Sequence, residues 1–160
     1  MKWTIIVSVV AVVIVAIGVV YALAEIGFIN ISYRIVPTTQ PPTMNPSSVS
    51  LDLGEIPSGS FGTKDFGKVA TLNLPANYEI TFILDTETVK DFVRFTVYIK
   101  IYEGTDLIHT VTLYDYEPWN EESVELEAGT YDIYVSVEYE ASSVTGEKTG
   151  AVLVTIYYPG

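Results

Sequence analysis

An uncharged, strongly apolar run near the amino end constrains this chain more than any other feature. Residues 3–23 contain no charged side chain, and their only polar side chains are Thr4, Ser8 and Tyr21. An apolar α-helix of ~20 residues matches the thickness of the hydrocarbon core of a bilayer. The run therefore predicts a helix that crosses a membrane or directs export, so that the rest of the chain folds outside the cytoplasm.

Two interpretations of residues 1–24 stay open. The small-x-small sequence Ala22-Leu23-Ala24 before Glu25 predicts a cleaved signal peptide. The apolar run exceeds the ~7–15 residues of a signal-peptide core, which favours an uncleaved signal-anchor. In both cases Lys2 keeps the amino end in the cytoplasm. We expect a single-pass protein of the cell membrane or cell surface with its carboxy-terminal domain outside, or a protein secreted after cleavage at Ala24.

Composition excludes several classes of function. The chain has a net charge of −12 and contains no cysteine. An acidic surface repels nucleic acid and anionic lipid. Without cysteine there is no disulfide scaffold, no thiol nucleophile and no cysteine-bound metal. An acidic surface could attract cations, basic partners or a cationic matrix, but the favoured interpretation is a charged surface that keeps the domain soluble. Nothing in the composition indicates a small-molecule substrate.

Residues 25–36 predict a juxtamembrane strand. Its apolar side chains alternate with polar ones and would lie on one face, which makes them candidates for strand pairing: Ile29, Ile31, Tyr33 and Ile35. Asn30-Ile-Ser32 is the one N-glycosylation sequon, and Asn30 points away from that face. The next segment, 37–48, holds four prolines and predicts an extended linker outside any sheet.

Residues 49–160 predict a domain built from strands. Apolar and polar residues alternate with period two in a series of short segments separated by turns, at 49–53, 68–74, 78–84, 93–101, 107–114, 124–126, 131–141 and 150–158. The loops are expected at 57–59, 61–67 and 103–106, and no amphipathic helix is predicted. The fold class is all-β: an immunoglobulin-like or fibronectin-III-like antiparallel β-sandwich without the inter-sheet disulfide, preceded by the amino-terminal helix.

The segment Leu126-Glu-Ala-Gly-Thr-Tyr131 matches a tyrosine corner. In such a corner the tyrosine ring packs at the sandwich edge and its hydroxyl bonds to backbone a few residues upstream. Gly129 would supply the turn, and Tyr131 would hold the crossover between the sheets. Both are therefore predicted to be structural residues.

Carboxylates in two interstrand loops are the candidates for a cation site, because Ca²⁺ prefers oxygen ligands from flexible loops. One loop holds Asp85, Glu87 and Asp91, and the other holds Asp115, Glu117, Glu121 and Glu122. Neither has EF-hand spacing, so solvated acidic loops are the favoured interpretation and no other cofactor is predicted. His109 is the single histidine and lies in a plain strand pattern, without the nucleophile sequence that a catalytic relay needs.

Three aromatic residues lie beside the second acidic loop: Tyr114, Tyr116 and Trp119. If exposed, they would stack on a sugar or anchor a partner. The favoured interpretation is that Trp119 packs beneath the loop and closes the end of the sandwich.

The layout of this chain resembles that of archaeal cell-surface proteins. The features that carry the resemblance are the apolar segment at 1–24, the isolated strand at 29–35 and the cysteine-free sandwich with its tyrosine corner at 126–131. Such proteins include subunits of donor-strand-assembled threads or bundling pili and the anchored sandwich proteins of the archaellum stator. The resemblance implies assembly of copies, or contact with other envelope proteins, and carries no functional residue across.

The expected function is a non-enzymatic structural or interaction protein of the cell envelope. It would be anchored through residues 3–23 or would assemble into a surface filament by pairing of residues 29–35 with a neighbouring subunit. The strand at 29–35 could instead fold back onto its own domain as a first strand. An extracytoplasmic module that binds calcium or carbohydrate is the alternative.

Overall fold

The computed structural model describes residues 40–159, which belong to one compact unit. The apolar run at 3–23, the cleavage site after Ala24 and the strand at 29–35 lie outside the described residues. Within 40–159 there is no helix of the length and apolarity required to span a bilayer. The described unit consists of strands, their connecting loops and one short 3₁₀ helix.

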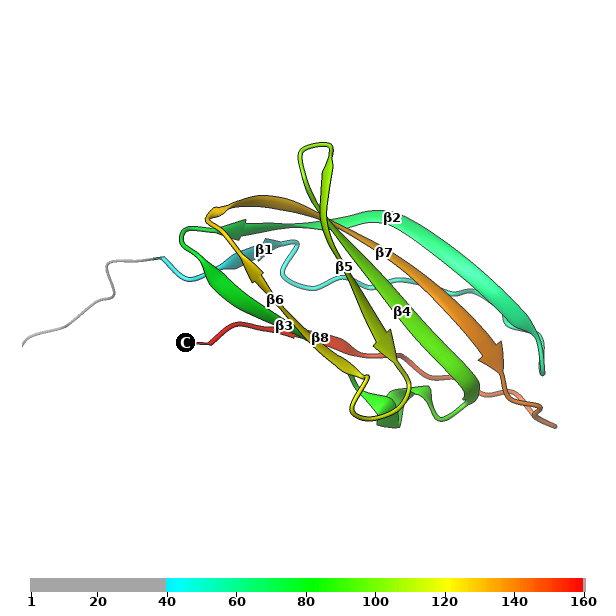
Figure 1. Cartoon of the computed structure of the whole chain (residues 1–160). Coiled ribbons are helices and arrows are strands. Elements are labelled where there is room, and N and C mark those ends of the chain that lie inside the picture. Colours follow the sequence, from blue (N-terminus) through cyan, green and yellow to red (C-terminus); the bar gives the residue numbers. More distant parts are fainter. Residues whose placement is uncertain (1–39, 160) are drawn as a thin grey trace, which may run out of the picture. The chain divides into compact units, whose positions relative to one another are not determined.

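Two antiparallel sheets make up this unit (Figure 1). The larger sheet has the strand order β1-β2-β7-β4-β5, and the smaller has the order β6-β3-β8. Their bounds are β1 Thr43–Asn45, β2 Phe61–Leu74, β3 Tyr78–Leu84, β4 Phe92–Glu103, β5 Asp106–Tyr114, β6 Glu121–Leu126, β7 Gly129–Ala141 and β8 Val154–Tyr157, and the 3₁₀ helix, η1, spans Thr86–Val89. The predicted all-β class is confirmed for the described residues.

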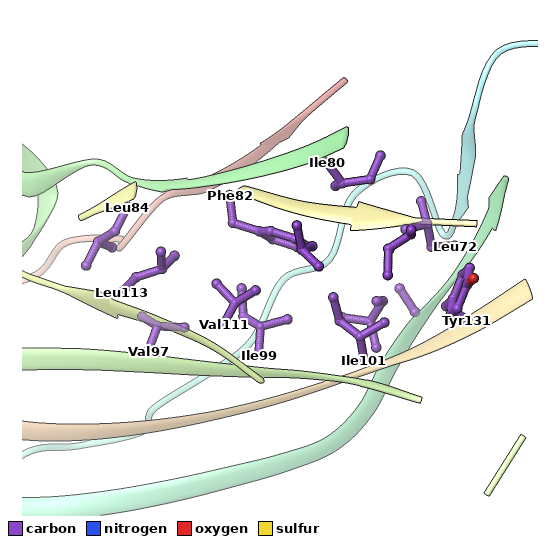
Figure 2. Packing of buried hydrophobic residues seen from close by; sticks show 14 of the residues in the cluster. Leu72, Ile80, Phe82, Leu84, Val97, Ile99, Ile101, Val111, Leu113 and Tyr131 are labelled. Atoms are coloured by element: carbon purple, nitrogen blue, oxygen red, sulfur yellow. The ribbon is translucent and has the colours of Figure 1, made fainter. Parts of the chain in front are cut away.

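One apolar core lies between the two sheets. The most deeply buried side chains include Phe82 and Leu84 from β3, Ile101 from β4 and Leu113 from β5, all 0% exposed. Figure 2 shows Phe82 and Leu84 from the small sheet facing Val97, Ile99 and Val111 from the large one. Every second residue of these strands points inward, because side chains alternate between the faces of a strand. The period-two pattern in the sequence therefore identified most of the core.

Two residues of strand β4 differ in exposure from what the alternation predicted over 93–101 implies, since that pattern places Val93 inward and Thr96 outward. Val93 was expected to face inward but is 62% exposed, because a register shift between Phe92 and Arg94 leaves it outside the pairing with β7. Thr96 faces away from the core as predicted, yet it is buried. Its neighbours in register are Tyr114 on β5 and Glu138 on β7, and their larger side chains flank it.

The proline-rich segment 37–48 was predicted to lie outside any sheet, and this is wrong for three of its residues. Thr43–Asn45 forms β1, which pairs antiparallel with Thr71–Asn73 of β2. Pro46 follows at once, and a strand at the edge of a sheet tolerates such a neighbour because its outer side needs no donor. The sheet therefore begins before the predicted domain boundary at residue 49.

The strand predicted at 49–53 is absent, although its apolar residues do alternate. Val49 and Leu51 are exposed, and only Leu53 packs against the core. The Asp52 carboxylate accepts a hydrogen bond from the Gly54 backbone N–H at 2.8 Å, and Gly54 has a positive φ of 76°. This local side-chain turn competes with sheet pairing.

The loop predicted at 61–67 is also wrong, because this segment forms the first half of β2. It pairs with β7 from Phe61↔Glu140 onward. Register shifts at Asp65/Gly67 and at Lys68/Ala70 accommodate Gly67, whose φ is 67°. Pairing with the long strand β7 thus keeps residues 61–67 in the sheet, although their glycine-rich sequence is typical of a turn.

The hydrogen bond expected of a tyrosine corner is present where β6 leads into β7. The Tyr131 hydroxyl donates to the Glu127 carbonyl at 3.0 Å, and the Tyr131 ring is buried. Gly129 lies under this ring, because a Cβ there would come within 3.3 Å of the hydroxyl. Burial raises the pKa of Tyr131 above its usual 10.0, with the Glu103 and Glu127 charges adding to the effect.

We expect Tyr131→Phe to lower the free energy of unfolding by ~1 kcal/mol at pH 7, which is the usual net contribution of one hydrogen bond. Because the folded-state pKa of Tyr131 is raised, its contribution is complete below pH 10.0 and declines as the pH rises through the folded-state pKa. The difference between wild type and variant in urea unfolding should therefore shrink above pH 10. The control is Tyr157→Phe at an exposed ring, and a difference that grows with alkaline pH would contradict the assignment.

Candidate interaction surface

The outer face of the large sheet carries a group of tyrosines, which we call the tyrosine face. Each of these residues follows or precedes a buried residue of its strand and so points away from the core. The group consists of Tyr98 and Tyr102 on β4, Tyr114 on β5 and Tyr134 on β7, all half-buried. The sequence prediction named Tyr114 alone. The available signal for the others was a tyrosine that directly follows an inward-facing aliphatic residue of its strand: Val97, Ile101 or Ile133.

Contacts on this face hold the rings in defined positions. Tyr102 and Tyr134 pack edge to face with ring centroids 5.1 Å apart. The Tyr98 hydroxyl donates to the Glu138 carboxylate at 3.1 Å. Burial, followed by that hydrogen bond, raises the pKa of Tyr98. Rings fixed in this way lose little side-chain entropy when a partner binds.

Charged residues on the same face are of both signs. Lys68 and Asp132 form an ion pair at 2.7 Å, and the Lys68 hydrogen bond lowers the pKa of Asp132. Lys100 lies beside Tyr134 in register, and Arg94 lies beside Glu140. The face is therefore amphipathic and mixed in charge, in contrast to the strongly acidic chain as a whole.

The tyrosine face continues into the loop between β5 and β6, residues 115–120, which we call the aromatic loop. Tyr114 and Tyr116 lie with ring centroids 5.6 Å apart. Tyr116 is 53% exposed and Trp119 is 60% exposed. The prediction that Trp119 packs beneath the loop is therefore wrong, and the exposed alternative is correct.

Hydrogen bonds hold the aromatic loop in place although its rings are exposed. The backbone N–H of Trp119 donates to the Tyr116 carbonyl at 3.0 Å, and the backbone N–H of Tyr114 donates to the Trp119 carbonyl at 2.9 Å. The Asp115 carboxylate accepts from the Phe95 N–H at 3.0 Å and ties the loop to β4. Trp119 therefore lies on a loop that closes on its own backbone and leaves the ring exposed.

The four carboxylates proposed as a cation site do not come together. Within 40–159, no three acidic or histidine side chains are arranged so that they could hold a metal ion. Asp115 is occupied by the Phe95 N–H, and Glu122 accepts from the Thr112 N–H at 2.8 Å. Glu117 and Glu121 are exposed. Asp115 and Glu117 lie in the loop between β5 and β6, whereas Glu121 and Glu122 are consecutive in β6 and point to opposite faces of that strand. Closeness along the chain therefore does not bring the four side chains into one cluster.

The other acidic loop has structural contacts. Asp85 caps η1 by accepting from the Glu87 N–H at 3.0 Å. Asp91 lies 3.5 Å from Lys148, and Glu87 pairs with Lys90. These contacts account for the carboxylates without a cation.

His109 joins the two sheets. Its Nε2 lies 2.8 Å from Glu122 Oε1, and the second oxygen of Glu122 binds the Thr112 N–H. His109 shares the inward-facing side of β5 with Val111 and Leu113, whereas Leu107 is exposed beyond the register shift at Ile101/Tyr102. The register shift therefore interrupts the plain strand pattern expected around His109.

Two groups of candidate residues lie outside the described part of the chain. They are the sequon residue Asn30 and the strand-pairing residues Ile29, Ile31, Tyr33 and Ile35. They stay predictions from the sequence.

Comparison with known proteins adds no relative: no family model matches the chain, and a search of curated proteins finds no match. The surface itself is therefore the basis for assigning a function. Its most distinctive part is the loop that carries two exposed aromatic residues, Tyr116 and Trp119, on a hydrogen-bonded backbone beside a tyrosine-rich sheet face.

Proposed function

We propose that this chain is a non-enzymatic structural or interaction protein of the cell envelope. Its sandwich would stand outside the membrane, held by residues 3–23 or released after Ala24, and would bind a protein partner through the aromatic loop and the tyrosine face. The observation that carries the proposal is the exposure of Tyr116 and Trp119 on a loop held by five hydrogen bonds, two of them between Asn120 and Leu84 of β3. Membrane attachment, and filament assembly through residues 29–35, are supported by the sequence pattern alone.

Tyrosine and tryptophan suit this role for a physical reason. Both bury a large apolar area and keep one polar atom for hydrogen bonding, so they are enriched among the residues that dominate binding energy. Aromatic rings on a tethered loop are already ordered before a partner arrives, which reduces the entropy lost on binding. Loops positioned by a rigid sandwich are a common place for such residues.

The strand order supports the immunoglobulin-like assignment within the sandwich class. If β3 is equated with strand B, then β4, β5, β6 and β7 correspond to C, C′, E and F. The observed order β5-β4-β7 in the large sheet then corresponds to the order C′-C-F of that fold, and the pair β6-β3 in the small sheet corresponds to E-B. Tyr131 lies near the start of the strand equated with F. The terminal strands differ, since β2 takes the place of G beside F and β8 takes the place of A beside B. Such sandwiches serve many functions, so the assignment adds nothing about the partner.

A carbohydrate-binding module is the second candidate. The same two exposed rings favour it, because a sugar stacks on an open aromatic face and the exposed Glu117 and Glu121 could bond its hydroxyls. A calcium module has less support, because the described carboxylates are separated or already bonded.

The proposal is tested by binding of the purified full chain to the envelope fraction of the source cell. We expect the double variant Tyr116→Ala/Trp119→Ala to bind at least ~30-fold more weakly, since one dominant aromatic contributes ~2 kcal/mol or more. Its melting temperature should stay unchanged because both rings are exposed. The matched control is Phe61→Ala/Val93→Ala, which removes two exposed apolar side chains elsewhere.

Treatment of the envelope fraction distinguishes the candidates. Loss of binding after protease digestion supports the protein partner, whereas loss after periodate oxidation of sugars supports the carbohydrate module. Equal binding by wild type and the double variant would contradict both. The variant Asp115→Ala, which keeps the rings but removes the tether to Phe95, should also weaken binding, and Asp115→Asn should retain most of it because its amide oxygen still accepts.

A further inference from the structure

The described sandwich has four edge strands, and they differ in how they are protected. The large sheet ends at β1 and β5, and the small sheet ends at β6 and β8. An edge strand presents unpaired N–H and C=O groups, which recruit another strand unless charge, proline, a bulge or a covering segment prevents it. The state of each edge therefore indicates where a second chain can add.

Two edges of the large sheet are blocked. The β1 edge is only three residues long and is followed by Pro46. Where β1 does not cover β2, the edge is formed by β2 itself, which contains two register shifts and the basic residues Lys64 and Lys68. On β5 the Thr112 N–H is taken by the Glu122 carboxylate and the Tyr114 N–H by the Trp119 carbonyl. Both arrangements are common protections against edge pairing.

The β6 edge of the small sheet is protected by charge. Glu121 and Glu125 are exposed on this strand, and Glu125 lies opposite Glu79 of β3. A second copy brought to this edge would place like charges side by side, which is unfavourable.

The remaining edge, β8, spans four residues, Val154–Tyr157, and differs from the other three edges in that no charged side chain and no hydrogen bond among the described residues blocks it. Residues 151–158 read Ala-Val-Leu-Val-Thr-Ile-Tyr-Tyr, without charge, glycine or proline. The Asp85 N–H bonds to the Leu153 carbonyl at 2.9 Å, so by antiparallel alternation Thr155 and Tyr157 direct their backbone groups toward β3. The backbone groups of Val154 and Ile156 then point away from β3, and among the described residues no hydrogen bond reaches them.

Exposed apolar side chains accompany this open edge. Leu153 is 53% exposed, Tyr157 is 53% exposed and Tyr158 is 43% exposed. Residues 40–159 hold six basic and nineteen acidic side chains, since Lys2, Arg34 and Glu25 precede them. Two copies therefore repel each other over most of their surface. At β8 they can meet without placing like charges opposite one another.

We propose that β8 pairs antiparallel with β8 of a second copy about a two-fold axis, which joins two three-stranded small sheets into one continuous sheet. The pairing satisfies the outward groups of Val154 and Ile156 and covers Leu153, Tyr157 and Tyr158. Such a contact uses the same patch on both copies, so it closes as a dimer and does not extend into a filament. The pairing does not depend on the aromatic loop.

Single-cysteine cross-linking of the full chain in its membrane tests this pairing. The chain has no cysteine, so each variant carries one thiol. We expect Thr155→Cys to give a dimer with a short bismaleimide, whereas the matched variant Thr110→Cys on the β5 edge stays monomeric. Adding Ile156→Pro, which removes an outward N–H, or Tyr157→Glu, which brings two like charges together, should reduce the Thr155→Cys dimer at least ~tenfold.

Three results would overturn the proposal. One is equal cross-linking at Thr155→Cys and Thr110→Cys, and another is an unchanged dimer yield in both edge variants. The third is loss of the Thr155→Cys dimer on deletion of residues 25–36, which would identify that segment as the strand at β8. Binding to the envelope fraction, measured on the same variants, reports separately on the aromatic loop.

Discussion

Replacing Phe82 by alanine should lower the free energy of unfolding by ~3–5 kcal/mol, a larger loss than we expect from any other single substitution proposed for this chain. Phe82 lies at the middle of β3, is 0% exposed and packs between the two sheets (Figure 2). Alanine would leave a cavity that the surrounding strands cannot fill, because both sheets are held in register by their hydrogen bonds.

Such a loss is a large part of the ~5–15 kcal/mol that stabilises a typical domain. The check is urea unfolding of the full chain in mild detergent, followed by far-ultraviolet circular dichroism, with an unchanged slope against denaturant. Thermal unfolding should shift downward by ~10–20 °C. The control is Phe61→Ala, whose ring is 70% exposed and whose loss should change stability by less than ~0.5 kcal/mol. Similar losses for both variants would contradict the placement of Phe82 in the core and of Phe61 on the surface.

The second large effect is expected at Glu122, whose carboxylate joins the two sheets along their β5 and β6 edges. One oxygen lies 2.8 Å from His109 Nε2, and the other accepts from the Thr112 N–H at 2.8 Å. Glu122→Ala removes both hydrogen bonds and leaves the Thr112 N–H without its acceptor. Because hydrogen bonds to charged groups contribute ~1.5–3 kcal/mol each, and this site is partly exposed, we expect a loss of ~2–3 kcal/mol.

Two variants of the same strand control this prediction. Glu122→Gln keeps an acceptor oxygen and should lose less stability than Glu122→Ala. Glu125→Ala removes an exposed carboxylate that lies opposite Glu79, so it should be neutral or slightly stabilising. If Glu122→Ala and Glu125→Ala unfold at the same urea concentration, Glu122 does not hold the sheets together.

The strand segments with strict alternation could be predicted well, and the reason is local. Residues 78–84 and 131–141 each place alternate side chains on one face, and both form strands with those side chains in the core. The hydrogen bond of Tyr131 is similarly local, because its acceptor lies four residues upstream. Alternation failed at 49–53, where a side-chain turn at Asp52 and Gly54 took the place of a partner strand.

The candidate surface could be predicted only in part. The cluster of Tyr114, Tyr116 and Trp119 is visible in the sequence, but the exposure of Trp119 depends on how the aromatic loop closes on its own backbone. The tyrosine face was missed because Tyr102 and Tyr134 come from strands far apart in the chain and meet only through pairing of β4 with β7. For the carboxylates beside the loop, proximity in sequence did not become a cluster that could hold a metal ion among the described residues.

The sequence by itself determined the all-β class, most of the core and the hydrogen bond of Tyr131 to Glu127, because each depends on residues within a few positions of one another. Tertiary structure alone decided the strand order, the pairing of Thr43–Asn45 with β2, the bridge from Glu122 to His109 and the open edge at β8. The physical reason is that strand pairing uses backbone groups that every residue carries. A sequence can therefore state which segments form strands, while their neighbours depend on how the whole core packs.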